Sequence, residues 1–190
     1  VFAVKDQDEN GRADNVRLIA DNLNQPAGVS MFGGDLYIAE IDKIWKIKDI
    51  ENWLISNPSS RPPLELVSDD LPDDEWHGWK WLAHDRDGNL YTNIGAPCNV
   101  CLKEDSRYAT IVKYDGNNWS IVARGVRNSV GFDFHPVSGE LYFGDNGRDW
   151  LGDDTPSCEL NRLTKEGSHF GFPYLHASKT IDPEFGKVSH

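Results

Sequence analysis

Three stretches of the sequence repeat one pattern, and this repeat limits the folds that the chain can adopt. They are NQPAGVSMFGGDLYIAE (24–40), HGWKWLAHDRDGNLYTNIG (77–95) and NSVGFDFHPVSGELYFGDNG (128–147). Each contains a Leu-Tyr pair after a glycine-containing turn, and the pairs, near residues 36, 90 and 141, recur about every 50 residues. Each pair should therefore open a β-strand that follows a tight turn.

Strand-like runs also flank each copy of the repeat. VRLIADNL, LELVSDDL and WSIVARGV come before the copies, and DKIWKIKD, ATIVKYDG and CELNRLTKEG come after them. Four short strands in about 50 residues are typical of one blade of a β-propeller. A helix of one or two turns is expected only in DIENWLISN (49–57). The sequence thus predicts an all-β fold, a β-propeller of four-stranded blades.

The chain holds about three to four such blades, whereas propellers usually have about four to eight. We therefore expect residues 1–190 to form one partial propeller domain, with no separate second domain. A small independent sheet protein is the alternative.

The charge balance narrows the class of partner. Lys and Arg number 19 against 31 Asp and Glu, and the net charge is −12. Nucleic acids and anionic membranes need a basic face, which this sequence does not contain. No apolar run approaches the roughly 20 residues of a membrane-spanning helix. We therefore expect no nucleic acid partner and no membrane span.

Alignment of the repeats suggests a site. His77 and Asn128 stand at the same distance before their Leu-Tyr pairs, and Asn24 matches them if the first turn is one residue shorter. We expect the three to begin the inner strands at the central channel, where they would converge on one pocket. The alternatives are turn residues that bond their own backbone for the two asparagines, and a histidine packed among aromatic rings for His77. His84 and His135 lie in turns at the opposite strand end, and we expect structural roles for them.

Long ordered motifs carry a family resemblance. EWHGWKWLAHDRDGNLYTNIGAPCNVC, ARGVRNSVGFDFHPVSGELYFGDNGRDWLGDD and ELNRLTKEGSHFGFPY resemble the sorbosone dehydrogenase branch of the soluble pyrroloquinoline quinone-dependent sugar dehydrogenases, over nearly the whole chain. The resemblance implies a six-bladed ring with His77 as general base. It also implies that Arg127 and Asn128 contact the quinone, and that the backbone carbonyls of Gly147 and Arg148 hold Ca²⁺.

The implied chemistry suits these residue types. Alcohol oxidation removes a hydroxyl proton, a task for a neutral imidazole, while the quinone takes a hydride and Ca²⁺ polarises it. Arg127 can fork onto a carboxylate or a quinone oxygen, or instead form a surface ion pair. Asn24, by its repeat position, is expected on the cofactor side. Trp76, Trp79 and Trp81 could supply an apolar wall over a planar cofactor or sugar. The alternative for Trp79 and Trp81, which alternate along a strand, is packing between blades.

The resemblance therefore predicts a periplasmic or extracellular oxidoreductase that oxidises a sugar-like alcohol or aldehyde and passes electrons to an external acceptor. Basic residues of later blades complete the sites of this family, so this chain alone should hold part of a pocket and be inactive. A calcium-dependent propeller lactonase and a non-catalytic binding module are the alternatives. The channel positions show no carboxylate, which counts against the lactonase.

Two further motifs could bind metal or form a crosslink. DQDENGRAD (6–14) has the order of a calcium loop, but Arg17 stands where that pattern needs Glu, so a partial calcium loop and an ordinary hairpin turn are both open. Cys98 and Cys101 have no second CxxC partner. Given the resemblance to exported enzymes, we expect a local disulfide between them, with Cys158 unpaired.

Overall fold

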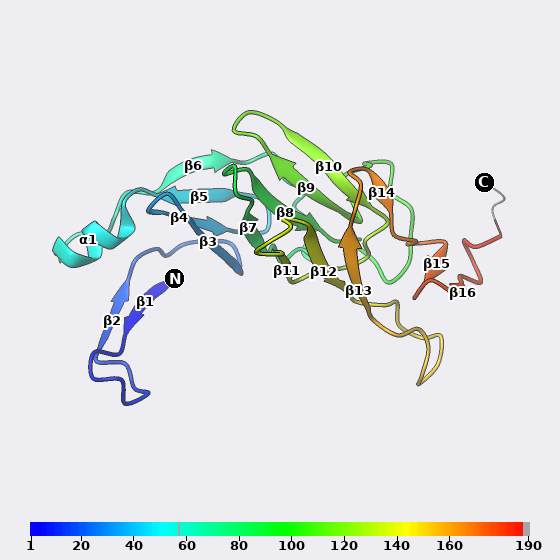
Figure 1. Cartoon of the computed structure of the whole chain (residues 1–190), viewed down its shortest axis with the longest axis horizontal. Coiled ribbons are helices and arrows are strands. Elements are labelled where there is room, and N and C mark those ends of the chain that lie inside the picture. The colour runs from blue at the N-terminus through cyan, green and yellow to red at the C-terminus, as the bar shows by residue number, and fades with distance from the viewer. Residues whose placement is uncertain (57, 188–190) are drawn as a thin grey trace.

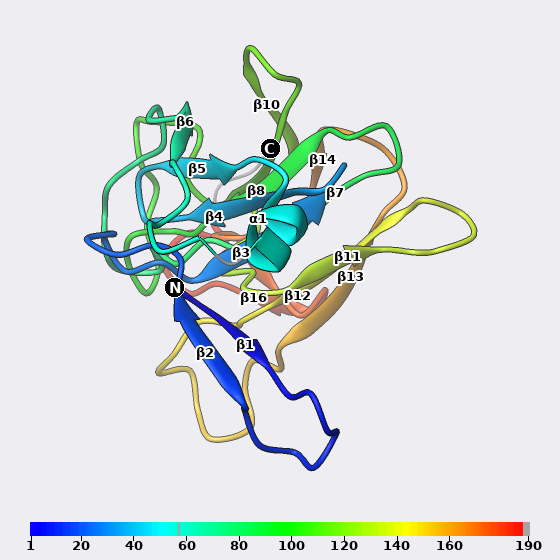
Figure 2. The ribbon, with the colours of Figure 1, turned by 90° about the vertical axis from the view of Figure 1, so that its left-hand side faces the viewer.

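The computed structural model describes residues 1–56 and 58–187. Nearly all of its regular structure is β, arranged as three successive, mainly antiparallel sheets with a hairpin before them and another after them (Figure 1). The first hairpin is formed by β1 (Phe2–Lys5) and β2 (Asn15–Leu18), and it projects away from the sheets (Figure 2). The all-β prediction is confirmed, whereas the number of blades in a closed ring stays a prediction.

The first sheet has the four consecutive strands expected of one blade. These are β3 (Gly28–Phe32), β4 (Asp35–Ala39), β5 (Ile44–Ile47) and β6 (Glu65–Ser68). The helix α1 (Ile50–Ser56) lies between β5 and β6, where the sequence predicted it. Among the described residues, no helix has the length and apolar character that a bilayer crossing requires.

The second sheet repeats this order and gains one strand. It contains β7 (Leu82–His84), β8 (Leu90–Ile94), β9 (Thr110–Tyr114), β10 (Trp119–Arg124) and, parallel to β10, β14 (Ser168–His169). The third sheet contains β11 (Phe132–Phe134), β12 (Leu141–Asp145) and β13 (Glu159–Leu163). A last hairpin pairs β15 (Leu175–His176) with β16 (Thr180–Ile181). Only the first sheet therefore has the predicted four strands. After β13, the described chain forms β14 at the edge of the second sheet and adds no fourth strand to the third.

Side-chain alternation places the core between the sheets. All five residues of β8 are buried because this strand has a sheet on either side. Leu90 and Ile94 belong to the apolar cluster shared with the first sheet, while the intervening Tyr91 belongs to the cluster shared with the third. The leucines of the three Leu-Tyr pairs are all buried, at 9, 3 and 3 % exposure. The repeat therefore recurs because each copy fills one layer of core.

The expectation that Asn24, His77 and Asn128 begin the inner strands is wrong. Strands β3, β7 and β11 start several residues later, so the three residues lie in the connections that lead into these strands.

A side chain explains the late start of β7. The Asn93 amide accepts a hydrogen bond from the Trp81 N–H (2.7 Å) and donates one to the Trp79 carbonyl (2.9 Å). In a longer β7, these backbone groups of Trp79 and Trp81 would bond to the backbone of β8. Here the side chain of the buried Asn93 bonds them instead, so the strand starts only at Leu82.

Candidate active site

Four connections between strands meet at one end of the sheets. In an antiparallel meander, the connections β6–β7, β8–β9, β10–β11 and β12–β13 all emerge on the same side. Hydrogen bonds join them: the Ala96 N–H donates to the Arg127 carbonyl (2.8 Å), and the Asn146 N–H donates to the Asn128 carbonyl (3.2 Å). Sequence-distant polar residues are therefore gathered in one place.

A cleft of about 500 Å³ opens at this end. It is lined by Gln25, Glu75, Trp76, His77, Gly78, Trp79, Asn128 and Val130. His77 and Asn128, equivalent in two repeats, therefore lie in one cleft. Asn24 is absent from this lining, and its neighbour Gln25 faces the cleft instead.

The His77 ring is held in one tautomer. Its Nδ1 lies 2.6 Å from the Ala96 carbonyl oxygen, which can only accept, so Nδ1 carries the proton and Nε2 carries a lone pair. Burial lowers the pKa of His77, and the charge of Arg127 lowers it further against the opposing effect of the Ala96 hydrogen bond. The imidazole is therefore neutral at pH 7 and able to accept a proton at Nε2.

Close packing fixes the position of this ring. His77 has a φ of 57°, in the left-handed region that non-glycine residues seldom occupy. A Cβ added at Gly95 would lie 2.6 Å from both the Cβ and the carbonyl oxygen of His77. Only glycine at residue 95 permits this approach, and a strained backbone kept in this way is typical of functional sites.

The guanidinium of Arg127 is fully occupied by the protein. Nε donates to the Asn99 carbonyl (2.8 Å), Nη1 to the carbonyls of Asn146 (3.2 Å) and Gly147 (2.9 Å), and Nη2 to Asn99 Oδ1 (3.0 Å) and Asp149 Oδ2 (3.3 Å). These bonds use all five N–H donors of the side chain. In this arrangement Arg127 ties connections together and has no donor left for a cofactor.

The two residues assigned to calcium have other partners. The Gly147 carbonyl accepts from Arg127, so a cation bound there would lie beside a buried positive charge. The Arg148 side chain is buried, and its Nη1 donates to Asp182 Oδ2 (2.5 Å), which also lies 2.9 Å from His176 Nε2. The Gly147 carbonyl, bonded to a guanidinium, does not fit the proposed calcium. The side-chain contacts of Arg148 do not involve its carbonyl, so the assignment of that carbonyl stays a prediction.

Asn128 is positioned through its backbone and keeps a free side-chain acceptor. Its N–H donates to Asp145 Oδ1 (2.7 Å), and the N–H of Arg127 donates to Asp145 Oδ2 (2.9 Å). Burial raises the pKa of Asp145 to about 7, against the lowering effect of these two donors. Asn128 Oδ1 is buried without a hydrogen-bond partner in the described structure. An orphaned acceptor beside His77 fits a ligand hydroxyl or a cation.

Sequence reasoning missed two residues that organise this end of the sheets, Asn99 and Asp145. Asn99 lies inside the Cys98–Cys101 pair, and Asp145 directly precedes the Asn-Gly-Arg run. The sequence offered two signals for them: an aspartate at the end of a predicted strand, and an asparagine inside the predicted disulfide loop.

The tryptophans divide between two roles. Trp76 and Trp79 are 53 and 58 % exposed and line the cleft, and the Trp79 indole N–H donates to Gln25 Oε1 (3.2 Å). The indole N–H of Trp81 instead donates to the Phe132 carbonyl (2.8 Å), which links the second sheet to the third.

The structural roles expected for the two turn histidines are confirmed. His84 Nδ1 lies 2.8 Å from the Ser30 hydroxyl, and its ring stacks on Phe32 while burial lowers its pKa to about 4. His135 Nδ1 accepts the Ser138 N–H (3.1 Å) within its turn.

The acidic motif near the N-terminus forms the loop of hairpin β1–β2. Side-chain oxygens of Asp6, Asp8 and Asp14 lie within 4.8 Å of one another, but they also accept the N–H groups of Asn10, Gly11 and other loop residues. The motif thus lies in a hairpin loop, and its three carboxylates are close enough to hold one ion, so both interpretations stay open.

The predicted disulfide is confirmed. Cys98 and Cys101 are bonded, with their Cα atoms 6.2 Å apart, and Cys158 is free and exposed.

Comparisons with known proteins agree with the architecture. No family model matches the chain. An uncharacterized protein of Borreliella burgdorferi is 37 % identical over 164 residues, which cover 83 % of this chain and 43 % of that protein. This chain thus spans less than half the length of that relative.

Solved structures match along most of the chain. The holo pyranose dehydrogenase PQQ domain of Coprinopsis cinerea has a TM-score of 0.70 at 15 % identity, over 87 % of this chain and 47 % of that one. A Trichoderma reesei protein of carbohydrate-active enzyme family AA12 has a TM-score of 0.71 at 18 % identity, over 98 % of this chain and 54 % of that one. A calcium structure of that protein matches at 0.70. The chain therefore has the fold of these domains over about half of their length.

Proposed function

We propose that this chain is part of a propeller dehydrogenase that oxidises a sugar-like alcohol or aldehyde, with His77 as the base. The observation that carries this proposal is the fixed tautomer of His77, which leaves an unprotonated Nε2 in a cleft walled by exposed tryptophans. The support for redox chemistry is the shared fold with the PQQ domain of a pyranose dehydrogenase.

Four of the cleft residues have a task in this reaction. Nε2 of His77 accepts the proton of the substrate hydroxyl while the carbon loses a hydride. Trp76 and Trp79 offer apolar faces to the C–H groups of a sugar ring, and they exclude water from the reacting hydroxyl. Asn128 lines the cleft with His77, and its side-chain amide would bond a second hydroxyl of the sugar and so orient the ring.

The proposed hydride acceptor is pyrroloquinoline quinone, which when bound would supply a carbonyl able to take up the hydride. Its carboxylates require cations, but the residues that line the cleft include no lysine or arginine. Arg127 and Gly147 are bonded to each other, so we assign neither quinone nor calcium to them in this arrangement. We propose that the cofactor contacts come from blades beyond those described, since the matched domains are about twice as long.

The Cys98–Cys101 disulfide supports a periplasmic or extracellular location, because such bonds persist in oxidising compartments. Electrons would then pass to an external acceptor. The sorbosone branch of the superfamily stays part of this proposal.

The test is dye reduction by the full-length protein with added quinone and Ca²⁺ against a panel of sugars, in wild type and His77→Ala. His135→Asn is the matched control, since it removes an imidazole from a turn while keeping a side-chain acceptor there. We expect quinone-dependent activity in wild type and the control, and its loss in His77→Ala. Calcium-dependent opening of lactones without quinone binding would replace this proposal with a hydrolase. Sugar binding without either reaction would identify a binding module.

A further inference from the structure

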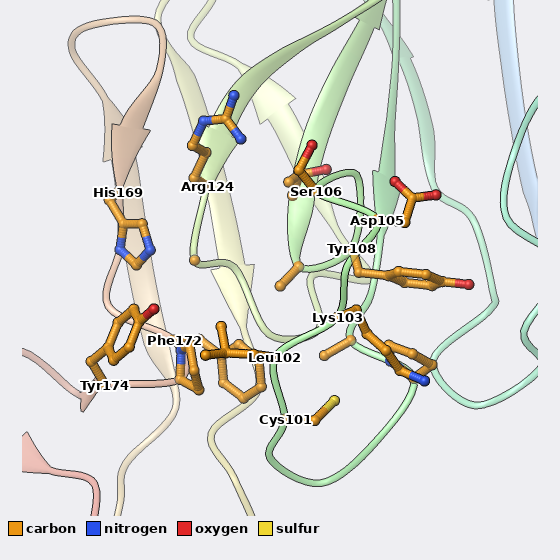
Figure 3. A pocket seen from close by; sticks show the side chains of 16 residues that line it. Cys101, Leu102, Lys103, Asp105, Ser106, Tyr108, Arg124, His169, Phe172 and Tyr174 are labelled. Carbon is orange, nitrogen blue, oxygen red and sulfur yellow. The ribbon is translucent and has the colours of Figure 1, made fainter. Parts of the chain in front are cut away.

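A second cleft lies at the same end of the sheets and is separate from the one that contains His77. It has a volume of about 210 Å³ and opens between the β8–β9 connection and residues 169–174 (Figure 3). The two clefts share no lining residue. Nothing in the proposed dehydrogenase reaction uses it.

One wall of this cleft is fixed by the strand β14. Arg124 pairs with His169 across the parallel β10–β14 contact, and the Phe172 N–H donates to the Gly125 carbonyl (3.0 Å). A Cβ at Gly125 would lie 2.4 Å from the His169 ring, so glycine at this position lets the ring lie against the backbone.

The opposite wall is fixed within the β8–β9 connection. The disulfide closes its first turn at Cys101. The Arg107 guanidinium donates to both carboxylate oxygens of Asp105, from Nε (3.0 Å) and Nη2 (2.8 Å) to Oδ2, and from Nε to Oδ1 (3.1 Å). Asp105, the acidic residue in the cleft lining, is therefore neutralised by a partner of its own.

Two cations in the lining have no such partner. Lys103 and Arg124 are exposed, and within residues 1–56 and 58–187 neither side chain forms an ion pair or a hydrogen bond. Acidic groups outnumber basic ones in this chain, 31 to 19, so unpaired cations beside the apolar side chains of Leu102 and Phe172 require a reason. Figure 3 shows all four around the opening.

We propose that this cleft binds a small organic anion with a flat apolar body, such as an aromatic carboxylate. Arg124 offers a planar fork for a carboxylate, and Lys103 adds a mobile positive charge. The ring of the ligand packs against Leu102 and Phe172. A volume of about 210 Å³ equals about seven waters at about 30 Å³ each, room for one substituted ring.

This placement couples the cleft to His77 through one peptide group. Ala96 lines the second cleft, and its carbonyl accepts the Nδ1–H of His77 on the other side. The two clefts therefore meet at Ala96.

The test is a titration of the isotope-labelled chain with benzoate, followed by amide chemical shifts, alongside benzamide as a neutral ligand of the same shape. We expect saturable benzoate binding with shifts near Leu102, Gly125 and Tyr174, and binding of benzamide that is about tenfold weaker. Arg124→Gln should weaken benzoate about tenfold, which corresponds to about 1.4 kcal/mol.

Lys165→Gln is the matched control, because it removes one positive charge from an exposed connection at the opposite end of the sheets. It should leave benzoate affinity unchanged, whereas Lys103→Gln should reduce it. Equal affinity for benzoate and benzamide, or shifts confined to the His77 cleft, would overturn the proposal. The ligand comparison on wild-type protein needs no variant, and its result does not depend on dehydrogenase activity.

Discussion

Replacement of Gly95 by alanine should displace the proposed base without touching its side chain. The added Cβ would lie 2.6 Å from the Cβ and the carbonyl oxygen of His77, whereas ordinary contacts begin at 3.4 Å. His77 must therefore move by roughly 0.8 Å, enough to stretch its 2.6 Å bond to Ala96 toward the limit of a hydrogen bond. Overpacking of this kind costs about 1–3 kcal/mol of folding free energy.

The functional cost follows from the same displacement. A misplacement of about 1 Å lowers catalysis by about 100-fold. The pKa of His77 should fall further at the same time, because the stretched hydrogen bond to Ala96 is the largest effect that raises it.

Two measurements check this prediction: the titration of the His77 ring by NMR, and kcat/KM of the full-length protein for sugar oxidation. Gly131→Ala is the matched control, because residue 131 also flanks a strand at this end and no atom lies within 4 Å of a Cβ placed there. It should change neither quantity. A folded Gly95→Ala protein with an unaltered His77 titration and activity within about threefold of wild type would refute the reasoning.

Three further predictions concern the residues that support this end of the sheets. Asp145→Asn puts a donor against the N–H groups of Arg127 and Asn128, and should cost about 1–3 kcal/mol in urea unfolding at pH 8. Because the pKa of Asp145 is raised from 3.8 to about 7, the folded state binds its proton more tightly, so this residue makes wild-type stability fall as pH rises between those values. The variant should lack that part of the pH slope, and an unchanged slope would contradict the assignment. A lysine at residue 127 has too few N–H donors for the five acceptors, so Arg127→Lys should lower the free energy of unfolding by about 3 kcal/mol, measured from the denaturant midpoint. A decrease below about 0.5 kcal/mol would show that these hydrogen bonds contribute little to stability. Replacement of Cys98 and Cys101 by serine should lower stability by about 2 kcal/mol through loop entropy, and equal midpoints for the oxidised and reduced wild type would count against this.

The strands and the core could be predicted because they depend on local pattern. Alternating side chains identify the faces of a strand, and a repeated Leu-Tyr pair marks the layer that each copy fills. The strands β4, β8 and β12 each contain one of these pairs, and the helix at residues 50–56 also lies where the local sequence predicted it. The register of the repeats also indicated that His77 and Asn128 would meet, and they line one cleft.

The sequence by itself therefore determined the all-β architecture, the core positions and the residues worth testing. The tertiary structure alone decided what those residues contact. Arg127 suits a cofactor carboxylate in isolation, but acceptors from two other connections occupy all of its donors: three backbone carbonyls, the Asn99 side-chain amide and the Asp149 carboxylate. Neither the hydrogen bonds of Arg127 nor the close contact between Gly95 and His77 can be read from the local sequence. Each joins segments that become neighbours only when the sheets pack.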